Sequence, residues 1–273
     1  MRATCNANGG PTSADGPAPS SSAAIWTRPP LRRVSKAAQH ERGNRHENHL
    51  DRQRVARPGP WSGLVAEHLK RGFDVIATVR KAADEADLKA LPGAQRLTLH
   101  HLDVTSDDDI ARLAKDLPAD LDVVFINAGI SGPKSVVTAS VDELNQIMQA
   151  NVFGPVRLAH ALLGRVRPRT GILAFMSSIM GSIAENESGS MEVYRASKTA
   201  QNSFARSLWL GSAREAGVTV LSIHPGWVKT DMGGAGADID VDTSVTGIAD
   251  QMAASHGAHA HRFIDYSGHE IAW

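Results

Sequence analysis

The sequence predicts an α/β fold in which helices cover both faces of a doubly wound, parallel β-sheet. Short apolar runs alternate with helical segments, a pattern typical of right-handed βαβ units. The 273 residues suit one large domain. A hydrophobic content of 42% and a charged content of 21% are ordinary for a globular protein that buries such a sheet.

Apolar runs give the predicted strands. Five runs read as strands and a short sixth would end the sheet: residues 73–79, 97–104, 121–126, 171–176, 218–223 and 262–266. Apolar positions three and four apart predict helices over residues 64–72, 107–117, 141 to about 164, and 193–216. Thr105 or Ser106 would cap the second of these helices, and Asp107-Asp108-Asp109 would suit its positive dipole end.

The first 62 residues differ in composition from the rest. Residues 1–22 are rich in Gly, Pro, Ser and Ala, and residues 27–60 are crowded with Arg and His. Such a segment buries too little apolar surface to offset its ordering entropy. We therefore expect residues 1–62 to be disordered or poorly packed, and residues 63–273 to form the domain. A basic binding tail is the alternative interpretation of the first segment.

Charge and cysteine content exclude several classes of partner. The net charge is zero, with 29 basic and 29 acidic residues, which argues against a nucleic-acid or membrane-surface partner. The single cysteine, Cys5, cannot form an internal disulfide and favours a reducing compartment. No apolar run has the length of a membrane span, and the N-terminus lacks the apolar core of a secretory signal. We therefore expect a cytoplasmic protein.

Small or hydrogen-bonding residues follow three predicted strands, where ligands bind in open parallel sheets. These residues are Asn127-Ala128-Gly129, Ser177-Ser178 and the run from His224 to Thr230. Downstream, Tyr194 and Lys198 are four residues apart and would share one face of a helix. An ammonium beside a phenol favours the phenolate, so Lys198 would lower the pKa of Tyr194 from about 10. The alternative is an incidental pair on a surface helix, although Tyr194 is one of only two tyrosines.

In combination, these residues resemble the short-chain dehydrogenase/reductase family over residues 63–273. The resemblance rests on Asn127-Ala128-Gly129, Asn151, Ser178, Tyr194-x-x-x-Lys198 and Pro225-Gly226. Finer detail is similar to the C-factor-like or sniffer-like carbonyl reductases, in residues 176–183, 194–198, 224–234 and 263–268. It implies a Rossmann-like fold and NAD(P)-dependent hydride transfer to or from a small-molecule carbonyl or alcohol. It also implies a homodimer or homotetramer formed through the long helices that hold Asn151 and Tyr194.

The resemblance implies four catalytic roles. Tyr194 would exchange a proton with the substrate oxygen, and Lys198 would lower the tyrosine pKa and hold the nicotinamide ribose. Ser178 would hydrogen-bond the carbonyl, because the second serine of the pair is the active one in the family. Asn151 would support a water-linked proton path. The stretch from Ser178 to Tyr194 is a few residues longer than the common spacing, which leaves the choice between the two serines open.

The charge of the residue that follows the predicted strand 73–79 indicates whether NADP(H) or NAD(H) is the preferred cofactor. Arg80 follows Val79 at a position where a carboxylate would favour NAD, so a cation there favours NADP(H), with NAD(H) possible. A solvated surface arginine is the alternative. Asp103-Val104 resembles the family's adenine contact, or Asp103 only caps the next turn. The expected cofactor-binding residues are Gly63, Arg80, Asp103, Val104, Asn127, Ala128, Gly129, Tyr194, Lys198, Pro225, Gly226, Val228 and Thr230.

Two further features carry weaker interpretations. His256, His259 and His261 have no carboxylate or cysteine at ligand spacing, so a solvated loop is favoured over a metal site. Gly233-Gly234-Ala235-Gly236 is interpreted as a mobile substrate loop, because it follows no strand directly and opens no clear helix.

The family's first strand and its Thr-Gly-x-x-x-Gly-x-Gly turn are missing. Residues 53–63 offer only Gly63 as a match, so we expect a degraded first strand. Back-translation of residues 47–61, shifted by one base, permits Lys-Thr-Ile-Leu-Ile-Val-Ser-Ala-Ser-Arg-Gly-Leu-Gly-Leu-Gly, which suggests a reading-frame error. Three functions follow: an active reductase, a non-catalytic C-factor-like signalling or binding protein, or the inactive product of a frame-shifted gene.

Overall fold

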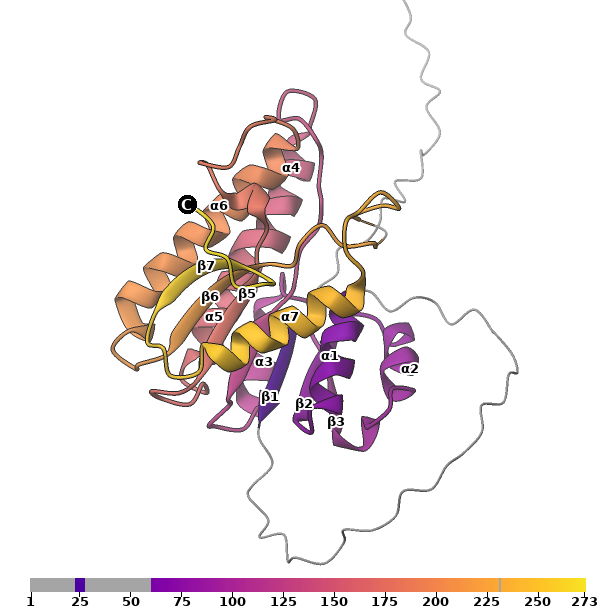
Figure 1. Cartoon of the computed structure of the whole chain (residues 1–273), viewed down its shortest axis with the longest axis vertical. Helices are drawn as coiled ribbons and strands as arrows, with labels where there is room; N and C mark the ends of the chain where they lie inside the picture. The colour runs from indigo at the N-terminus through magenta and orange to yellow at the C-terminus, as the bar shows by residue number, and fades with distance from the viewer. Residues whose placement is uncertain (1–22, 28–59, 231) are drawn as a thin grey trace, which may run out of the picture.

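A computed structural model describes residues 23–27, 60–230 and 232–273. Within them, one sheet has the strand order β3-β2-β1-β4-β5-β6-β7 (Figure 1). The strands are β1 (Ala23–Thr27), β2 (Asp74–Val79), β3 (Leu97–His101), β4 (Val123–Ile126), β5 (Ile172–Met176), β6 (Thr219–His224) and β7 (His261–Asp265). Each strand expected from an apolar run is confirmed, although the run at 97–104 leaves the sheet after His101. The doubly wound α/β fold is therefore confirmed.

Helices alternate with these strands. They are α1 (Pro60–Lys70), α2 (Ala83–Lys89), α3 (Asp107–Asp116), α4 (Val141–Met148), α5 (Gly154–Leu163), α6 (Glu192–Leu208) and α7 (Val241–Ala254). A π-helical turn, Gln149–Phe153, joins α4 to α5, and a second, Trp209–Ala213, extends α6. The predicted long helices are thus continuous but locally widened. Ser106 caps α3 by accepting a 3.2 Å hydrogen bond from the Asp109 amide, and the three aspartates occupy its first turn.

Sequence reasoning missed α2 and α7. Helix α2 is short and polar, and only Leu88 is buried, so it carries no apolar stripe. Helix α7 did carry a signal, because Asp240 accepts a 2.8 Å hydrogen bond from the Thr243 amide as N-cap. Its buried apolar residues Val245, Ile248, Ala249 and Met252 also repeat at helical spacing.

Two apolar layers cover the two faces of the sheet. One holds buried residues of α1 and α7 against the strands, including Leu64, Leu69, Ile248 and Met252. The other holds residues of α3, α5 and α6, including Leu113, Leu158, Leu162 and Leu208. In Figure 1, α1 and α7 lie side by side over one face. None of the helices in the described ranges is long and apolar enough to cross a bilayer.

The central strand corrects a sequence-based expectation. The first strand was expected to be degraded, yet Ala23–Thr27 occupies the centre of the sheet, between β2 and β4. Ala23 and Ile25 face one apolar layer and Ala24 and Trp26 the other, so the strand is buried on both sides. Four consecutive apolar residues are enough to form a buried central strand, although the sequence around them is poor in aliphatic residues. The disorder expected for residues 1–22 and 28–59 lies outside the described residues.

The direction of β1 differs from that of every other strand. It is antiparallel to both neighbours, whereas all other paired strands are parallel. Ala23 pairs with Ile126 at the carboxyl edge, and Thr27 pairs with Asp74 at the amino edge. Helix α1 ends just before β2 begins, so its N-terminus at Pro60 lies at the carboxyl edge. Strand β1 therefore does not lead directly into α1, as a phosphate-binding strand–turn–helix unit requires.

Candidate active site

The expected catalytic residues converge at the carboxyl ends of β4 and β5. Asn151 lies in the π-helical turn, Ser178 follows β5, and Tyr194 and Lys198 lie on one face of α6. The Lys198 ammonium is buried and donates a 2.8 Å hydrogen bond to the Met176 carbonyl. It lies 5.9 Å from the centre of the Tyr194 ring. The helical spacing of four residues thus places both groups beside the end of β5.

The two neighbouring serines have different partners. Ser178 forms a side-chain hydrogen bond with Tyr194, and its Oγ also accepts a 3.2 Å bond from the Met180 amide. Ser177 instead donates a 2.7 Å hydrogen bond to Asn202 Oδ1 on α6. The structure therefore brings Ser178, and not Ser177, against the phenol.

Asn151 holds the segment after β4 in place. Its Nδ2 donates to the Ile130 carbonyl at 2.9 Å, and its Oδ1 accepts from the Ile130 amide at 2.7 Å. The same Nδ2 donates to Ser197 Oγ at 2.9 Å, and Ser197 in turn donates to the Tyr194 carbonyl at 2.7 Å. Asn151 is fully buried, so these bonds satisfy an amide that would otherwise be costly to bury. Sequence reasoning did not identify the roles of Ile130 and Ser197.

Burial dominates the acid–base chemistry of the pair. It raises the pKa of Tyr194 to about 12, against a smaller lowering by the hydrogen bond to Ser178. It lowers the pKa of Lys198 to about 7. The pKa of Tyr194 is therefore raised overall and not lowered as expected, because burial outweighs the hydrogen bond to Ser178. Tyr194 is accordingly a protonated phenol at neutral pH.

Residues expected to bind the nicotinamide half follow β4 and β6, and one of them, Gly129, borders Lys198. A Cβ on Gly129 would stand 3.4 Å from Asn151 Oδ1 and 3.5 Å from Lys198 Nζ, so this glycine borders both residues. Asn127 and buried Ala128 precede it at the end of β4. After β6, the Pro225 carbonyl accepts a 2.6 Å bond from Ser244 Oγ. Gly226 has a φ of +83° and a Cβ there would lie 2.5 Å from Ile239, so glycine is needed.

The remaining expected cofactor residues are more dispersed. Val228 is buried and pairs with Ile239, and Thr230 Oγ1 accepts a 3.0 Å bond from the Gly233 amide. Asp103 accepts hydrogen bonds from the Thr105 amide at 2.9 Å and hydroxyl at 2.7 Å, which is the capping role considered as its alternative. Arg80 follows β2 directly and is partly exposed. Val104 lies beyond the end of β3 and is buried.

Gly63 contacts a helix. It lies in the first turn of α1, where a Cβ would stand 2.8 Å from Val241 Cγ1 on α7. This glycine thus lets α1 and α7 approach closely. The segment 53–59, in which the family's phosphate-binding glycines were sought, lies outside the described residues.

The three histidines near the C-terminus have separate partners. His256 lies 3.9 Å from Asp122, His259 Nε2 is 2.7 Å from the Arg169 carbonyl, and His261 stacks on Trp209 and Trp273. Within the described ranges, no group of three or more His, Cys, Asp or Glu residues is arranged to hold a metal. Gly233 and Gly234 form a turn on Thr230, in the connection between β6 and α7.

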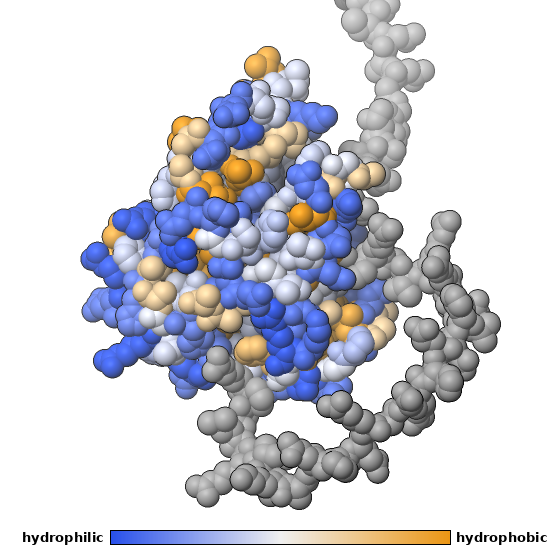
Figure 2. Space-filling view, in the orientation of Figure 1, coloured by the Kyte–Doolittle hydropathy of each residue, from blue (hydrophilic) through white to orange (hydrophobic). Residues whose placement is uncertain are grey.

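Exposed apolar side chains surround the catalytic edge. They are Val136 and Val137 after β4, Ile179 and Ile183 after β5, and Trp227 and Met232 after β6. Figure 2 shows the most hydrophobic surface gathered over the upper half of the molecule in this view, at the end where α4 lies in Figure 1. Glu192, missed by sequence reasoning, accepts a 2.6 Å bond from the Val136 amide and so joins the loop after β4 to the start of α6.

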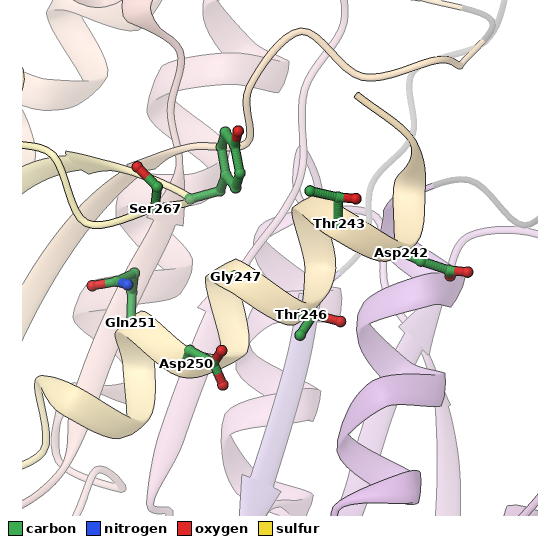
Figure 3. Close-up of a pocket in the computed structure, with 8 residues that line it drawn as sticks. Asp242, Thr243, Thr246, Gly247, Asp250, Gln251 and Ser267 are labelled. Carbon is green, nitrogen blue, oxygen red and sulfur yellow. The ribbon is translucent and has the colours of Figure 1, made fainter. Parts of the chain in front are cut away.

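A separate hollow lies along α7. It has a volume of about 540 Å³ and is lined by α7 residues such as Asp242, Thr246 and Asp250, with Ser267 from the segment after β7. Figure 3 shows Asp242, Thr246 and Asp250 along α7 and Ser267 on the neighbouring segment. None of the expected catalytic residues lines this hollow.

Comparisons with known proteins agree with this geometry. The family model described as short chain dehydrogenase matches residues 62–238. The C-signal protein of Myxococcus xanthus is 39% identical over 158 residues, covering 56% of this chain and 93% of that protein. A short chain dehydrogenase of Penicillium aethiopicum is 31% identical over 242 residues, covering 79% of this chain and 95% of that protein.

Solved structures give the same result. A short-chain dehydrogenase/reductase from Burkholderia multivorans with bound NADP superposes with a TM-score of 0.73 at 39% identity, covering 80% of this chain and 96% of the other. A carbonyl reductase from Pseudomonas aeruginosa in complex with NADP gives a TM-score of 0.72 at 37% identity, covering 79% and 95%. Together with the convergence of Ser178, Tyr194 and Lys198, these matches show that the chain belongs to the short-chain dehydrogenase family.

Proposed function

We propose that this protein is an NADP(H)-dependent carbonyl reductase, which in reverse oxidises the corresponding alcohol. The observation that carries the proposal is the placement of Ser178, Tyr194 and Lys198 together at the carboxyl end of β5, with Ser178 hydrogen-bonded to the phenol and Lys198 Nζ 5.9 Å from its ring. The Tyr194 hydroxyl, held beside Ser178, is placed to donate a proton to a carbonyl oxygen, which is the demand of carbonyl reduction.

Each catalytic residue has a defined task in this proposal. When bound, the nicotinamide supplies the hydride that reaches the carbonyl carbon. The Tyr194 hydroxyl donates its proton to the carbonyl oxygen, and Ser178 hydrogen-bonds the same oxygen and orients it. The Lys198 ammonium stabilises the phenolate left on Tyr194, because a positive charge favours the ionised phenol. Gly129 leaves room beside Lys198 for the nicotinamide ribose.

Two observations support NADP(H) over NAD(H). Arg80 follows β2 directly, where a guanidinium suits a 2′-phosphate. The similar structures from Burkholderia multivorans and Pseudomonas aeruginosa contain NADP. The exposed apolar side chains after β4, β5 and β6 further favour a small carbonyl compound with an apolar body.

The proposal is tested by NADPH fluorescence titration and by NADPH oxidation with a panel of aldehydes and ketones. Tyr194→Phe is the matched variant, since it keeps the ring and removes the proton donor. We expect wild-type turnover, and a loss of at least about 100-fold in Tyr194→Phe with NADPH affinity retained. Equal rates in the two proteins would contradict the assignment of Tyr194.

A second candidate function is a non-catalytic signalling or binding role. It is favoured by the similarity to the C-signal protein and by the direction of β1, which does not lead into α1. A defective copy of a reductase is a related possibility, consistent with the shifted frame over residues 47–61. Titrating NADPH into this chain and into a frame-restored chain separates the active reductase, the signalling or binding protein and the defective copy.

Each titration result supports one candidate. Binding by both chains, with turnover, supports the reductase. Binding by the restored chain alone identifies this chain as a defective copy. Binding without turnover in either chain supports the signalling or binding role. Coding DNA whose shifted frame lacks the glycine codons would rule out the reading-frame error.

We also propose a homodimer or homotetramer that uses the faces of α5 and α6. Phe153, Phe204 and Leu210 are exposed large apolar residues in these helices and their π turns. The rings of Phe153 and Phe204 meet edge to face, with centroids 6.3 Å apart, and so form a continuous patch. Light scattering on wild type and Phe204→Glu tests this, with a smaller particle expected for the variant.

A further inference from the structure

A buried glutamine links two of the catalytic residues. Gln201 lies on α6, three residues after Lys198, and is fully buried. Its Oε1 accepts a 3.3 Å hydrogen bond from the Lys198 ammonium. Its Nε2 donates a 2.8 Å hydrogen bond to the main-chain carbonyl of Asn151. Each end of one side-chain amide is therefore directed at one catalytic residue.

The Asn151 carbonyl lies where regular α-helical hydrogen bonding is interrupted. In an α-helix it would accept from the amide four residues later, but residue 155 is a proline and has no N–H. The π-helical turn at Gln149–Phe153 also interrupts the regular hydrogen bonding there. A buried carbonyl without a partner costs about 1–3 kcal/mol. Gln201 supplies a side-chain donor to this carbonyl from the neighbouring helix.

The Lys198 ammonium has three donor hydrogens, and two have protein acceptors. They bond to the Met176 carbonyl and to Gln201 Oε1, and these two bonds restrict rotation of the ammonium. One hydrogen remains for the side where Tyr194 lies, 5.9 Å away. Asn151 and Gly129, which also border Lys198, are neutral, so Tyr194 is the titratable group among the described residues that faces the ammonium.

We propose that Gln201 is a positioning residue, whose amide holds the Lys198 ammonium and the Asn151 carbonyl in fixed relation. The proposal rests on the proposed reductase function. An amide neither gains nor loses a proton near neutral pH, so Gln201 acts by its position and its hydrogen bonds and not as a proton carrier.

Two substitutions of opposite effect test the proposal. Gln201→Leu removes an acceptor from the ammonium, so the pKa of Lys198 falls below its value of about 7. Gln201→Glu places a carboxylate beside the ammonium, so the Lys198 pKa rises. If Gln201 only filled space and did not accept from the ammonium, Gln201→Leu would leave the Lys198 midpoint unchanged. Gln146→Leu, the same change on the exposed side of α4, is the matched control and leaves the titration unchanged.

The readout is the ¹³Cε chemical shift of Lys198 against pH, in protein labelled at lysine and assigned with Lys198→Arg. We expect midpoints shifted by about one pH unit, down in Gln201→Leu and up in Gln201→Glu. The pH profile of NADPH oxidation should shift in the same directions, with kcat reduced about tenfold in Gln201→Leu and KM nearly unchanged. An unchanged midpoint in folded Gln201→Leu would overturn the proposal. If Gln201→Leu fails to fold, Gln201→Met, which keeps the side-chain length and removes the amide, takes its place.

These outcomes also separate a failure of the proposed role of Gln201 from a failure of the proposed reductase function. Shifted midpoints in a protein that neither binds nor oxidises NADPH would support the Gln201 contact and reject the reductase. Normal turnover with midpoints that do not move would support the reductase and reject the role of Gln201.

Discussion

The indole of Trp26 lies against the imidazole of His68, with ring centroids 4.0 Å apart. This contact joins the central strand β1 to helix α1. Both residues are buried, and Trp26 also stacks on Phe125 of β4 at 6.2 Å. Trp26 thus connects two strands and a helix in one apolar layer. Strand β1 is held in the sheet by side-chain packing as well as by its hydrogen bonds to β2 and β4.

Replacing Trp26 with alanine should destabilise the protein strongly. Removal of a large buried side chain costs about 3–5 kcal/mol, because both burial and packing are lost. Trp227→Ala is the control, since Trp227 is 53% exposed and should cost less than about 1 kcal/mol. Urea unfolding measures both changes. A small cost for Trp26→Ala would mean that Ala23–Thr27 does not fill the sheet.

Stability should fall as the pH is lowered from about 6.5 to about 4. Burial lowers the pKa of His68 to about 4. Between the unfolded and folded pKa values, the unfolded chain binds more protons, so acid favours unfolding. One pKa unit corresponds to about 1.4 kcal/mol, so His68 alone contributes up to about 3 kcal/mol. Burial also lowers the pKa values of His224 and His261 to about 4, which adds in the same direction.

His68→Phe tests the contribution of this histidine. The variant keeps an aromatic ring against Trp26 and removes the titrating group. Unfolding free energies measured at about pH 7 and about pH 4.5 should differ less in the variant than in wild type. An identical pH dependence in the two proteins would show that His68 is not the group responsible.

Gly154→Ala should destabilise the start of α5. A Cβ at Gly154 would lie 2.3 Å from the Val104 carbonyl oxygen and 2.9 Å from that of Gln149, both of them backbone atoms. Neither atom can rotate away, so the cost should be about 1–3 kcal/mol. Gly211→Ala is the matched control, because a Cβ there meets nothing within 4 Å. Equal melting temperatures for the two variants would contradict the close approach of α5 to Val104.

Arg80→Glu should reverse the cofactor preference. The carboxylate would repel a 2′-phosphate and accept hydrogen bonds from a ribose diol, so NADPH affinity should fall about tenfold or more while NADH affinity rises. Lys81→Glu, the same charge change at the next and exposed residue, is the control. Fluorescence titrations with both nucleotides measure the effect. A loss of NADPH affinity that is equal in the two variants would point to general electrostatics instead of a phosphate contact.

The sequence by itself determined the strands of the sheet from β2 onward. It also determined which residues form the candidate active site. Apolar runs of four to six residues in a buried parallel strand need no distant information, because burial on both faces demands apolar side chains throughout. The spacing of Tyr194 and Lys198 likewise follows from helix geometry. The preference for Ser178 over Ser177 came from family resemblance, and the bond between Ser178 and Tyr194 supplies its physical basis.

Only the tertiary structure decided what fills the centre of the sheet and how the site is charged. A run as short as Ala23–Trp26 has no distinctive pattern, and its place depends on the gap that β2 and β4 leave between them. The pKa values of Tyr194 and Lys198 depend on burial by segments far away in the chain, which reversed the direction expected for the tyrosine. The link from Gln201 to Asn151 spans fifty positions of sequence and forms only when α6 packs against the π-helical turn.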